Sequence, residues 1–230
     1  MNLETREKIQ SLKDSGIEGH EFDEIVKSWP ADSENQRISV IKNFIRPEDC
    51  IQIIDFFSKQ KKQGFNSEKK FIGKTFPWQQ CRRLNPNHPD EYVVKLISSY
   101  RFNATIAARD FFQKDLYPEY TDLVAWKNGE DMNVHSDSFH MDGSPRDSRG
   151  SHKDWRYCGG VLYLNDDYAG GETYFPKFNI QVKPETGKLS LFMADWEHMH
   201  GVRRVTQGRD PIARYTMPIW FTEDYTKSEI

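Results

Sequence analysis

Residues 122–137, DLVAWKNGEDMNVHSD, join two short strand-like runs through a turn. The apolar run at residues 123–126 ends at Asn128-Gly129, a dipeptide typical of hairpin turns, and an alternating run follows. This pattern predicts a β-hairpin. His135 and Asp137 would then point to the same face of its second strand, because side chains alternate along a strand.

Five further strand-like runs follow, separated by Gly, Pro, Asn and Asp: YCGGVLYLND, GGETYF, IQVKPETGKLSLFM, HGVRRVTQG and RYTMPIWF. The first half reads differently, with helical patterns at residues 3–13, 21–29, 46–60 and 90–116 and one strand-like run at 37–45. Seven short strands after a mainly helical half predict an α+β fold with a mainly β core. The pattern indicates an antiparallel sandwich or a jelly roll (double-stranded β-helix), with the N-terminal helices packed on one sheet, and we expect the jelly roll in view of the family resemblance described below.

Composition narrows the class of protein. The chain has 230 residues and a formal net charge of −3, which favours neither a nucleic acid nor an anionic membrane as partner. Its three cysteines, Cys50, Cys81 and Cys158, form no CxxC pair, and the first residues contain no apolar signal segment. We therefore expect reduced thiols and a cytoplasmic protein.

Four His-X-Asp triplets begin at His88, His135, His140 and His152, and such a pair on a strand can grip one metal ion. The first and third of these lie in turn sequences, so the triplet at His135 is favoured and the one at His152 is its rival. A 2-His-1-carboxylate triad for Fe(II) needs one more histidine.

The third histidine would come from EHMHGV, which offers His198 and His200 two residues apart. The other feature near the triplets is a long segment at residues 138–154, rich in Ser, Gly, Asp, Arg and His. Loops of this length are commonly functional or mobile, so it is either a lid over a site or a solvated excursion with no role.

At residues 123–221 the sequence resembles the prolyl 4-hydroxylase-like branch of the Fe(II)/2-oxoglutarate-dependent dioxygenases. Five fragments occur in the family's order: WKNGEDMNVHSD, RYCGGVLYLNDDYAGGETYFP, VKPETGKLSLF, HGVRRVTQG and RYTMPIW. The resemblance implies one domain over residues 1–230, with 1–117 as mainly helical support and 118–224 as the catalytic jelly-roll core.

The resemblance also implies residue roles. His135, Asp137 and His200 would ligate iron. Arg214 would pair with the distal carboxylate of 2-oxoglutarate, since Arg matches a carboxylate with two parallel hydrogen bonds, and Arg209 is the rival. The remaining implied residues are Tyr163, donating a hydrogen bond to that carboxylate, Trp126, where the family commonly has a tyrosine, and Arg156 and Trp220 on the substrate side.

The implied activity is that of a procollagen-proline 4-dioxygenase-like enzyme acting on proline in a peptide or protein. Its cofactors would be Fe(II), 2-oxoglutarate as cosubstrate and O2, with ascorbate as a further candidate. Two alternatives stay open. One is an oxygenase acting on another residue or on a small molecule, and the other is a non-catalytic metal-binding jelly-roll module.

Overall fold

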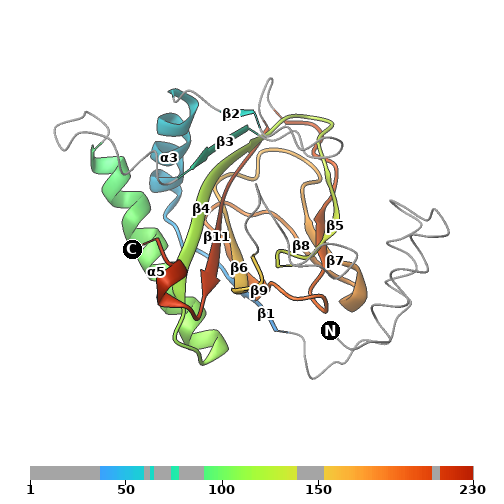
Figure 1. Ribbon diagram of the computed structural model, residues 1–230. Helices are drawn as coiled ribbons and strands as arrows, with labels where there is room; N and C mark the ends of the chain where they lie inside the picture. The colour runs from blue at the N-terminus through green and yellow to red at the C-terminus, as the bar shows by residue number, and fades with distance from the viewer. Residues whose placement is uncertain are drawn as a thin grey trace.

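The computed structural model describes residues 37–59, 63–64, 74–77, 91–138, 153–208 and 213–229. The helices expected at residues 3–13 and 21–29 lie outside this set, as does most of the loop at 138–154. Within the described chain two antiparallel sheets face each other, and helices cover the outer face of the larger one (Figure 1). The predicted jelly roll with helices on one sheet is therefore confirmed.

Among the described residues, the larger sheet has the strand order β1-β9-β6-β11-β4-β3-β2 and the smaller one the order β5-β10-β7-β8. The larger sheet comprises β1 (Ile38–Ile41), β2 (Gln63–Gly64), β3 (Lys74–Pro77), β4 (Tyr117–Trp126), β6 (Arg156–Tyr163), β9 (Leu189–Met193) and β11 (Arg214–Thr222). The smaller one comprises β5 (Met132–His135), β7 (Thr173–Phe175), β8 (Ile180–Val182) and β10 (His200–Val202). The strands from β4 to β11 thus divide equally between the sheets, as in a double-stranded β-helix.

The expected hairpin at residues 122–137 is wrong. Strand β4 pairs with β3 and β11, whereas β5 pairs with β10 in the other sheet. The turn between them is held from outside, because the amide of Gly129 donates to the carbonyl of Val205 at 2.7 Å. The run 180–193 is likewise two strands, β8 and β9, in different sheets. Long-range pairing decides these partners, and local turn signals do not report it.

Two helices pack on the larger sheet, α3 (Pro47–Lys59) and α5 (Glu91–Phe112). Proline suits the first helical position of α3, where its missing N–H costs nothing. Helix α5 stops before the expected residue 116, at Gln113, whose φ of 54° is left-handed. Their buried side chains join those of β4, β6, β9 and β11 in the largest apolar cluster.

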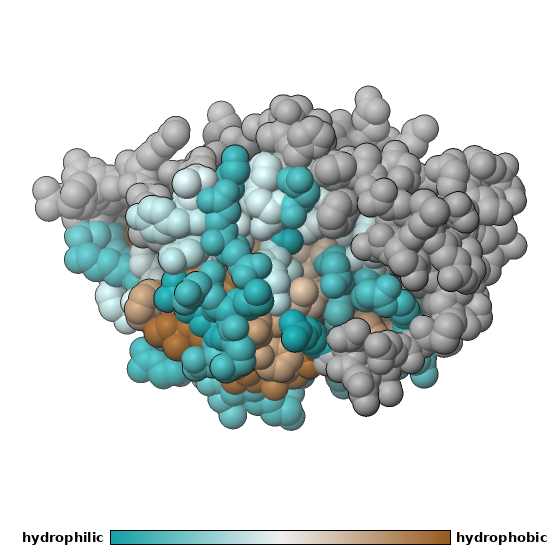
Figure 2. All heavy atoms as spheres, turned by 60° about the horizontal axis from the view of Figure 1, so that its bottom comes forward, coloured by the Kyte–Doolittle hydropathy of each residue, from teal (hydrophilic) through white to brown (hydrophobic). Residues whose placement is uncertain are grey.

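The surface shown in Figure 2 carries many hydrophilic residues (teal), with a smaller hydrophobic area (brown). Apolar side chains of the described chain are concentrated instead between the helices and the larger sheet. None of the described helices combines the length and the apolar character required to cross a bilayer.

Alternation along the strands gives the larger sheet two distinct faces. On β11, Met217, Ile219 and Phe221 join the cluster beneath the helices. The intervening residues, from Arg214 to Trp220, therefore face the smaller sheet. The same parity on β4 turns Trp126 away from the helices, into a cluster with Val202 and Val205.

The turn from β8 to β9 has little room for change at Gly187. Its φ is +78°, and an added Cβ would lie 2.1 Å from the carbonyl oxygen of Ile45. We expect Gly187→Ala to lower the free energy of unfolding by about 2 kcal/mol or more, measured by urea denaturation. Gly129→Ala is the matched control, since Gly129 also has a positive φ (+90°) but an added Cβ there meets nothing within 4 Å. Equal losses in both variants would show that the close approach is unimportant.

Candidate functional site

His135, Asp137 and His200 form a candidate metal group at the open edge of the smaller sheet. His135 ends β5 and His200 begins β10, and the register pairs the two residues directly. Nε2 of His135 lies 3.6 Å from Oδ1 of Asp137, and Nε2 of His200 lies 3.8 Å from Oδ2. The ligand atoms of all three residues lie within 4.8 Å of one another. Ligand atoms about 2.1 Å from one ion and at right angles lie about 3 Å apart, so the group would contract by roughly 1 to 2 Å on binding a metal.

The remaining ring nitrogens fix the orientation of both histidines. Nδ1 of His135 lies 2.9 Å from the carbonyl oxygen of Asn133, and Nδ1 of His200 lies 3.1 Å from that of His198. A carbonyl only accepts, so each Nδ1 carries the proton and each Nε2 is left with a lone pair for a metal. The donor set therefore fits a divalent transition metal.

Asp137 is ionised in this setting. Burial alone would raise the pKa of Asp137, but His200 and His135, when a proton rather than a metal occupies their Nε2 atoms, hold the pKa well below its ordinary value. A metal cation bound to the same Nε2 atoms would act in the same direction. Gly159 on β6 makes room for the carboxylate, because a Cβ there would lie 3.0 Å from Oδ2 of Asp137 and 3.5 Å from Trp220. Trp220 thus borders the metal group.

The other candidate histidines either lie away from the metal group, as His198 does, or belong to residues outside the described chain. Nδ1 of His198 lies 2.7 Å from Oδ1 of Asp195, and its ring packs on Phe178. The open choice between His198 and His200 is resolved in favour of His200. The triplets at 88, 140 and 152 involve histidines outside the described residues. Within the described chain, the candidate metal group contains no fourth His, Cys, Asp or Glu.

Arg214 forms a second feature of the barrel interior. Its side chain is 1% exposed, it makes no ion pair with a described carboxylate, and its Nε has no hydrogen-bond acceptor there. The guanidinium lies 4.8 Å from the ring of Trp126 and 5.7 Å from that of Tyr163. Burying a cation without a counter-charge is costly, so this arrangement is that of an anion site.

Several residues shape the pocket around Arg214. Gly171, with a φ of +70°, lets the arginine pass, since a Cβ there would lie 3.0 Å from its Cδ. The Tyr163 hydroxyl lies 2.7 Å from Oγ1 of Thr173, so it already has one partner and would need to share or exchange it to reach a ligand. The predicted roles of Tyr163 and Trp126 towards a cosubstrate stay predictions, although both rings flank the cation. The rival Arg209 lies outside the described residues.

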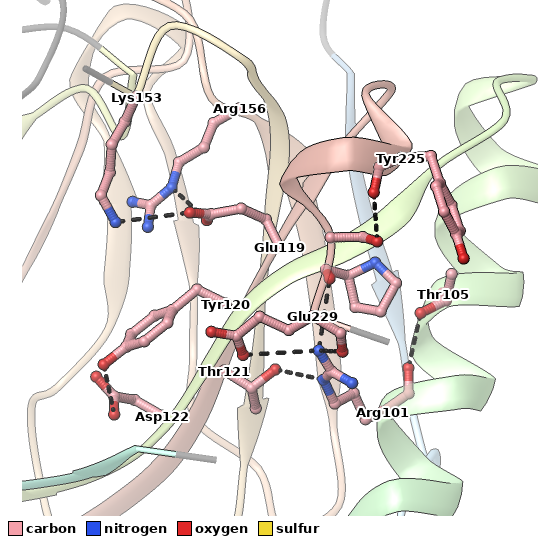
Figure 3. A network of polar contacts seen from close by, with 12 residues as sticks. Arg101, Thr105, Glu119, Tyr120, Thr121, Asp122, Lys153, Arg156, Tyr225 and Glu229 are labelled. Carbon is pink, nitrogen blue, oxygen red and sulfur yellow. Dashed lines mark hydrogen bonds and ion pairs between the residues drawn. The ribbon is translucent and has the colours of Figure 1, made fainter. Parts of the chain in front are cut away.

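At the opposite end of the inner face, Arg156 and Trp220 lie in contact, and their predicted roles towards a substrate stay predictions. The guanidinium of Arg156 stacks 4.4 Å from the Trp220 ring, and its Nε donates to Glu119 at 2.8 Å. Lys153 lies 3.6 Å from the other oxygen of Glu119 (Figure 3). Sequence reasoning missed Glu119. The register shift between Trp220 and Phe221, opposite this point of β4, gave no signal in the sequence.

Asp122 was also not identified from the sequence as a residue of the barrel interior. It lies on the inner face of β4 and is 6% exposed, and among the described residues it accepts one hydrogen bond, from the hydroxyl of Tyr120 at 3.3 Å. Burial raises its pKa to about 7, while Tyr120, Lys153 and Arg156 oppose that rise. The alternating sequence Tyr-Thr-Asp-Leu-Val could have shown that an acid falls on the inward parity.

A barrel of two facing sheets that holds a His-X-Asp…His group at one edge and a buried arginine on the last strand is the architecture of a metal-dependent oxygenase of the jelly-roll class. Residues 119–222 match the family model described as the 2OG-Fe(II) oxygenase superfamily. This part of the chain belongs to that superfamily, and the sequence-based assignment is confirmed.

Curated relatives point to one branch of the superfamily. Mouse prolyl 3-hydroxylase 3 is 40% identical over 73 residues, which is 30% of this chain and 9% of that protein. Human prolyl 3-hydroxylase 2 is 36% identical over 69 residues, or 28% of this chain and 9% of the relative. The chain thus spans about a tenth of the length of these relatives.

Solved structures share the fold at low identity. A prolyl hydroxylase from Trichoplax adhaerens, in complex with a hypoxia inducible factor peptide fragment, has a TM-score of 0.59 at 14% identity and covers 97% of this chain and 94% of its own. The viral collagen prolyl hydroxylase of Paramecium Bursaria Chlorella virus-1 has a TM-score of 0.56 at 16% identity, with coverage of 84% and 99%. A Pseudomonas putida prolyl-4-hydroxylase has 0.56 at 17%, with coverage of 84% and 96%.

Asp122 predicts an unusual dependence of stability on pH. Its carboxyl group ionises near pH 4 in the unfolded chain and at about 7 in the folded protein. Folding therefore becomes less favourable as pH rises through this window. Asp122→Asn removes the titration, so its stability relative to the parent should grow from pH 4 to pH 7. Since one pKa unit corresponds to about 1.4 kcal/mol, the gain at about pH 8 is at most about 4 kcal/mol.

Urea denaturation of both proteins at a series of pH values measures this difference. Asp110→Asn, on the exposed side of α5, is the control for replacing an aspartate by an asparagine. A difference between Asp122→Asn and the parent that stays flat with pH would contradict the burial of a titrating carboxyl group.

Proposed function

We propose that this protein is an Fe(II)- and 2-oxoglutarate-dependent hydroxylase that acts on proline in a peptide or protein. The observation that carries the proposal is the presence in one barrel of a His–Asp–His group and a buried arginine that pairs with none of the described carboxylates. The His–Asp–His group fits Fe(II), and the buried arginine fits a carboxylate of 2-oxoglutarate. A 2-oxoglutarate-dependent hydroxylase requires both sites.

His135, Asp137 and His200 would hold the iron on one flank. When bound, iron and 2-oxoglutarate supply the oxidising power: O2 gives one oxygen atom to a substrate C–H bond and one to succinate, with release of CO2. The protein holds the ligands in one tautomer and, through Phe192, whose ring centroid lies 4.4 Å from that of His200, keeps one side of the group apolar.

Arg214 would receive the distal carboxylate of 2-oxoglutarate. Trp126 and Tyr163 offer ring faces to the guanidinium and leave its donors for the ligand. Tyr168 is a further candidate to share in this contact, since its hydroxyl is buried beside the guanidinium of Arg214. Its pKa is raised by burial, with Arg214 as the main opposing influence, so it stays a neutral donor.

Arg156 and Trp220 would receive the peptide. Trp220 lies beside the metal group, and Arg156 is held over it by Glu119, so the guanidinium keeps donors for a peptide carbonyl. The names of the relatives and of the structural neighbours make a prolyl substrate the first choice.

The position of hydroxylation on the proline ring has two candidates. The sequence resemblance favours carbon 4, and the solved neighbours include a prolyl-4-hydroxylase. The curated relatives, at higher identity over a short segment, are prolyl 3-hydroxylases, which favours carbon 3.

Incubation of the protein with Fe(II), 2-oxoglutarate, ascorbate and proline-rich peptides tests the activity. We expect succinate release and the gain of one oxygen atom on proline by mass spectrometry, with NMR of the product distinguishing carbon 3 from carbon 4. His135→Ala, which removes a ligand, should abolish both. Succinate release with no peptide ever modified would reject the prolyl assignment and favour another residue or a small molecule.

The non-catalytic module makes a different prediction. Anaerobic Fe(II) and 2-oxoglutarate together give a weak visible charge-transfer band only where the metal has open positions for the keto acid. We expect the band in the parent and its loss in His135→Ala. No band in the parent would favour a closed, structural metal site.

The variant Arg214→Met distinguishes the effect of the buried guanidinium on the stability of the protein from its effect on ligand binding. Without ligand, we expect the variant to be at least as stable as the parent, because an unpaired buried charge is replaced by an apolar chain. With 2-oxoglutarate at about 100 times its Kd, the parent should gain about 2.7 kcal/mol and the variant almost nothing. Thermal unfolding with and without the ligand measures both, and Arg204→Met, at an exposed arginine paired with Asp131, is the control. Equal gains in Arg214→Met and the parent would move the carboxylate site elsewhere.

A further inference from the structure

Asp122 is a buried acid that the proposed chemistry does not use. It lies on the inner face of the larger sheet, on the same side of β4 as Tyr120 and opposite to Thr121, which turns to Arg101 of α5 (Figure 3). A carboxylate can accept about four hydrogen bonds, and from the described residues Asp122 accepts one, at the long distance of 3.3 Å. Buried acids are normally paired, so the described part of the chain leaves most of the acceptor capacity of Asp122 unused.

The register places Asp122 near the metal group. Thr216 pairs with Val124 and Ile219 with Thr121, so Asp122 lies opposite Pro218, which in turn pairs with Val161 on β6. The metal-group carboxylate lies against Gly159, the next inner-face position of β6. Since neighbouring strands lie about 4.8 Å apart, Asp122 is on the order of 10 Å from the metal group. That distance suits a side chain flanking the reacting residue.

The inner face of the larger sheet is positive near Glu119 and negative at Asp122. Arg156 and Lys153 both contact Glu119, so these three described residues together carry one net positive charge. Tyr120 lies between Glu119 and Asp122: Nζ of Lys153 lies 5.3 Å from the centre of its ring, and its hydroxyl donates to Asp122. A peptide lying along this face would meet donors at Arg156 and an acceptor at Asp122.

We propose that Asp122 is a specificity-determining residue that binds the cationic side chain of a lysine or arginine near the hydroxylated proline. A cationic side chain would bind most strongly beside Asp122, because it can donate to the unused carboxylate oxygens and neutralise a charge that is costly to bury. The inference rests on the proposed function, since it presumes a peptide in the barrel.

Paired peptides test the proposal. Each carries one target proline and a blocked N-terminus, with a lysine placed in turn at the three positions on either side. The matched peptide has norleucine, which keeps the length of the chain and removes the charge. In the parent, lysine should raise kcat/KM about tenfold over norleucine at one position or more. Free N-termini in a second set show whether an α-amine serves equally.

The ratio between the lysine and norleucine peptides is the quantity that matters. In Asp122→Asn this ratio should fall to about one, and in Asp110→Asn it should stay as in the parent. The anaerobic Fe(II)/2-oxoglutarate band in Asp122→Asn shows that the barrel has formed. A preference for lysine that survives in Asp122→Asn, or no preference at any position in the parent, overturns the proposal.

Failure of the prolyl assignment can be told apart from failure of this inference. If the parent hydroxylates no peptide, binding of the same peptides is measured by anaerobic calorimetry with Fe(II) and 2-oxoglutarate present. Tighter binding of a lysine peptide that Asp122→Asn loses supports the cation site although the reaction is different. Equal binding of lysine and norleucine peptides to the parent overturns it.

Discussion

The pairing of β5 with β10 is the contact on which the candidate metal group depends. It sets His135 opposite His200 at one edge of the smaller sheet, and Asp137 follows two residues later. These strands are short, so few backbone hydrogen bonds hold them. The turn at Gly129 and the strand β7 on the other side of β10 brace the pair. The metal, once bound, would add the cross-link that two short strands lack.

Charge inside the barrel is the second constraint. Arg214 and Asp122 are both buried on the inner face of the larger sheet, and neither has a described partner of opposite charge in contact. A protein selected for stability alone would not keep such groups, because each lowers the stability of the empty barrel. Their retention is best understood if ligands of opposite sign complete them, an anion at Arg214 and a cation at Asp122.

Periodicity and the order of the motifs were enough to predict the fold class and a candidate metal group. Alternation predicted an antiparallel sandwich or a jelly roll, and the resemblance of five ordered fragments to the dioxygenase family, rather than spacing alone, selected His135, Asp137 and His200. Strand partners were not predictable in this way. The dipeptide Asn128-Gly129 is typical of a hairpin turn, yet β4 and β5 belong to different sheets. Local turn chemistry fixes how a chain bends, whereas the partner of a strand depends on which distant residues bury its faces.

Glu119 and Asp122 show a further limit of sequence reasoning. Both lie on β4 in a stretch that reads as an ordinary strand, and their importance comes from a register shift and from neighbours on β6 and β11. Glu119 faces Arg156 across the sheet only because the ladder is irregular between Trp220 and Phe221. An irregularity of one residue thus brings an acid to the inner face, where it holds Arg156 over Trp220. Asp122 is then the nearby acid that no described cation contacts.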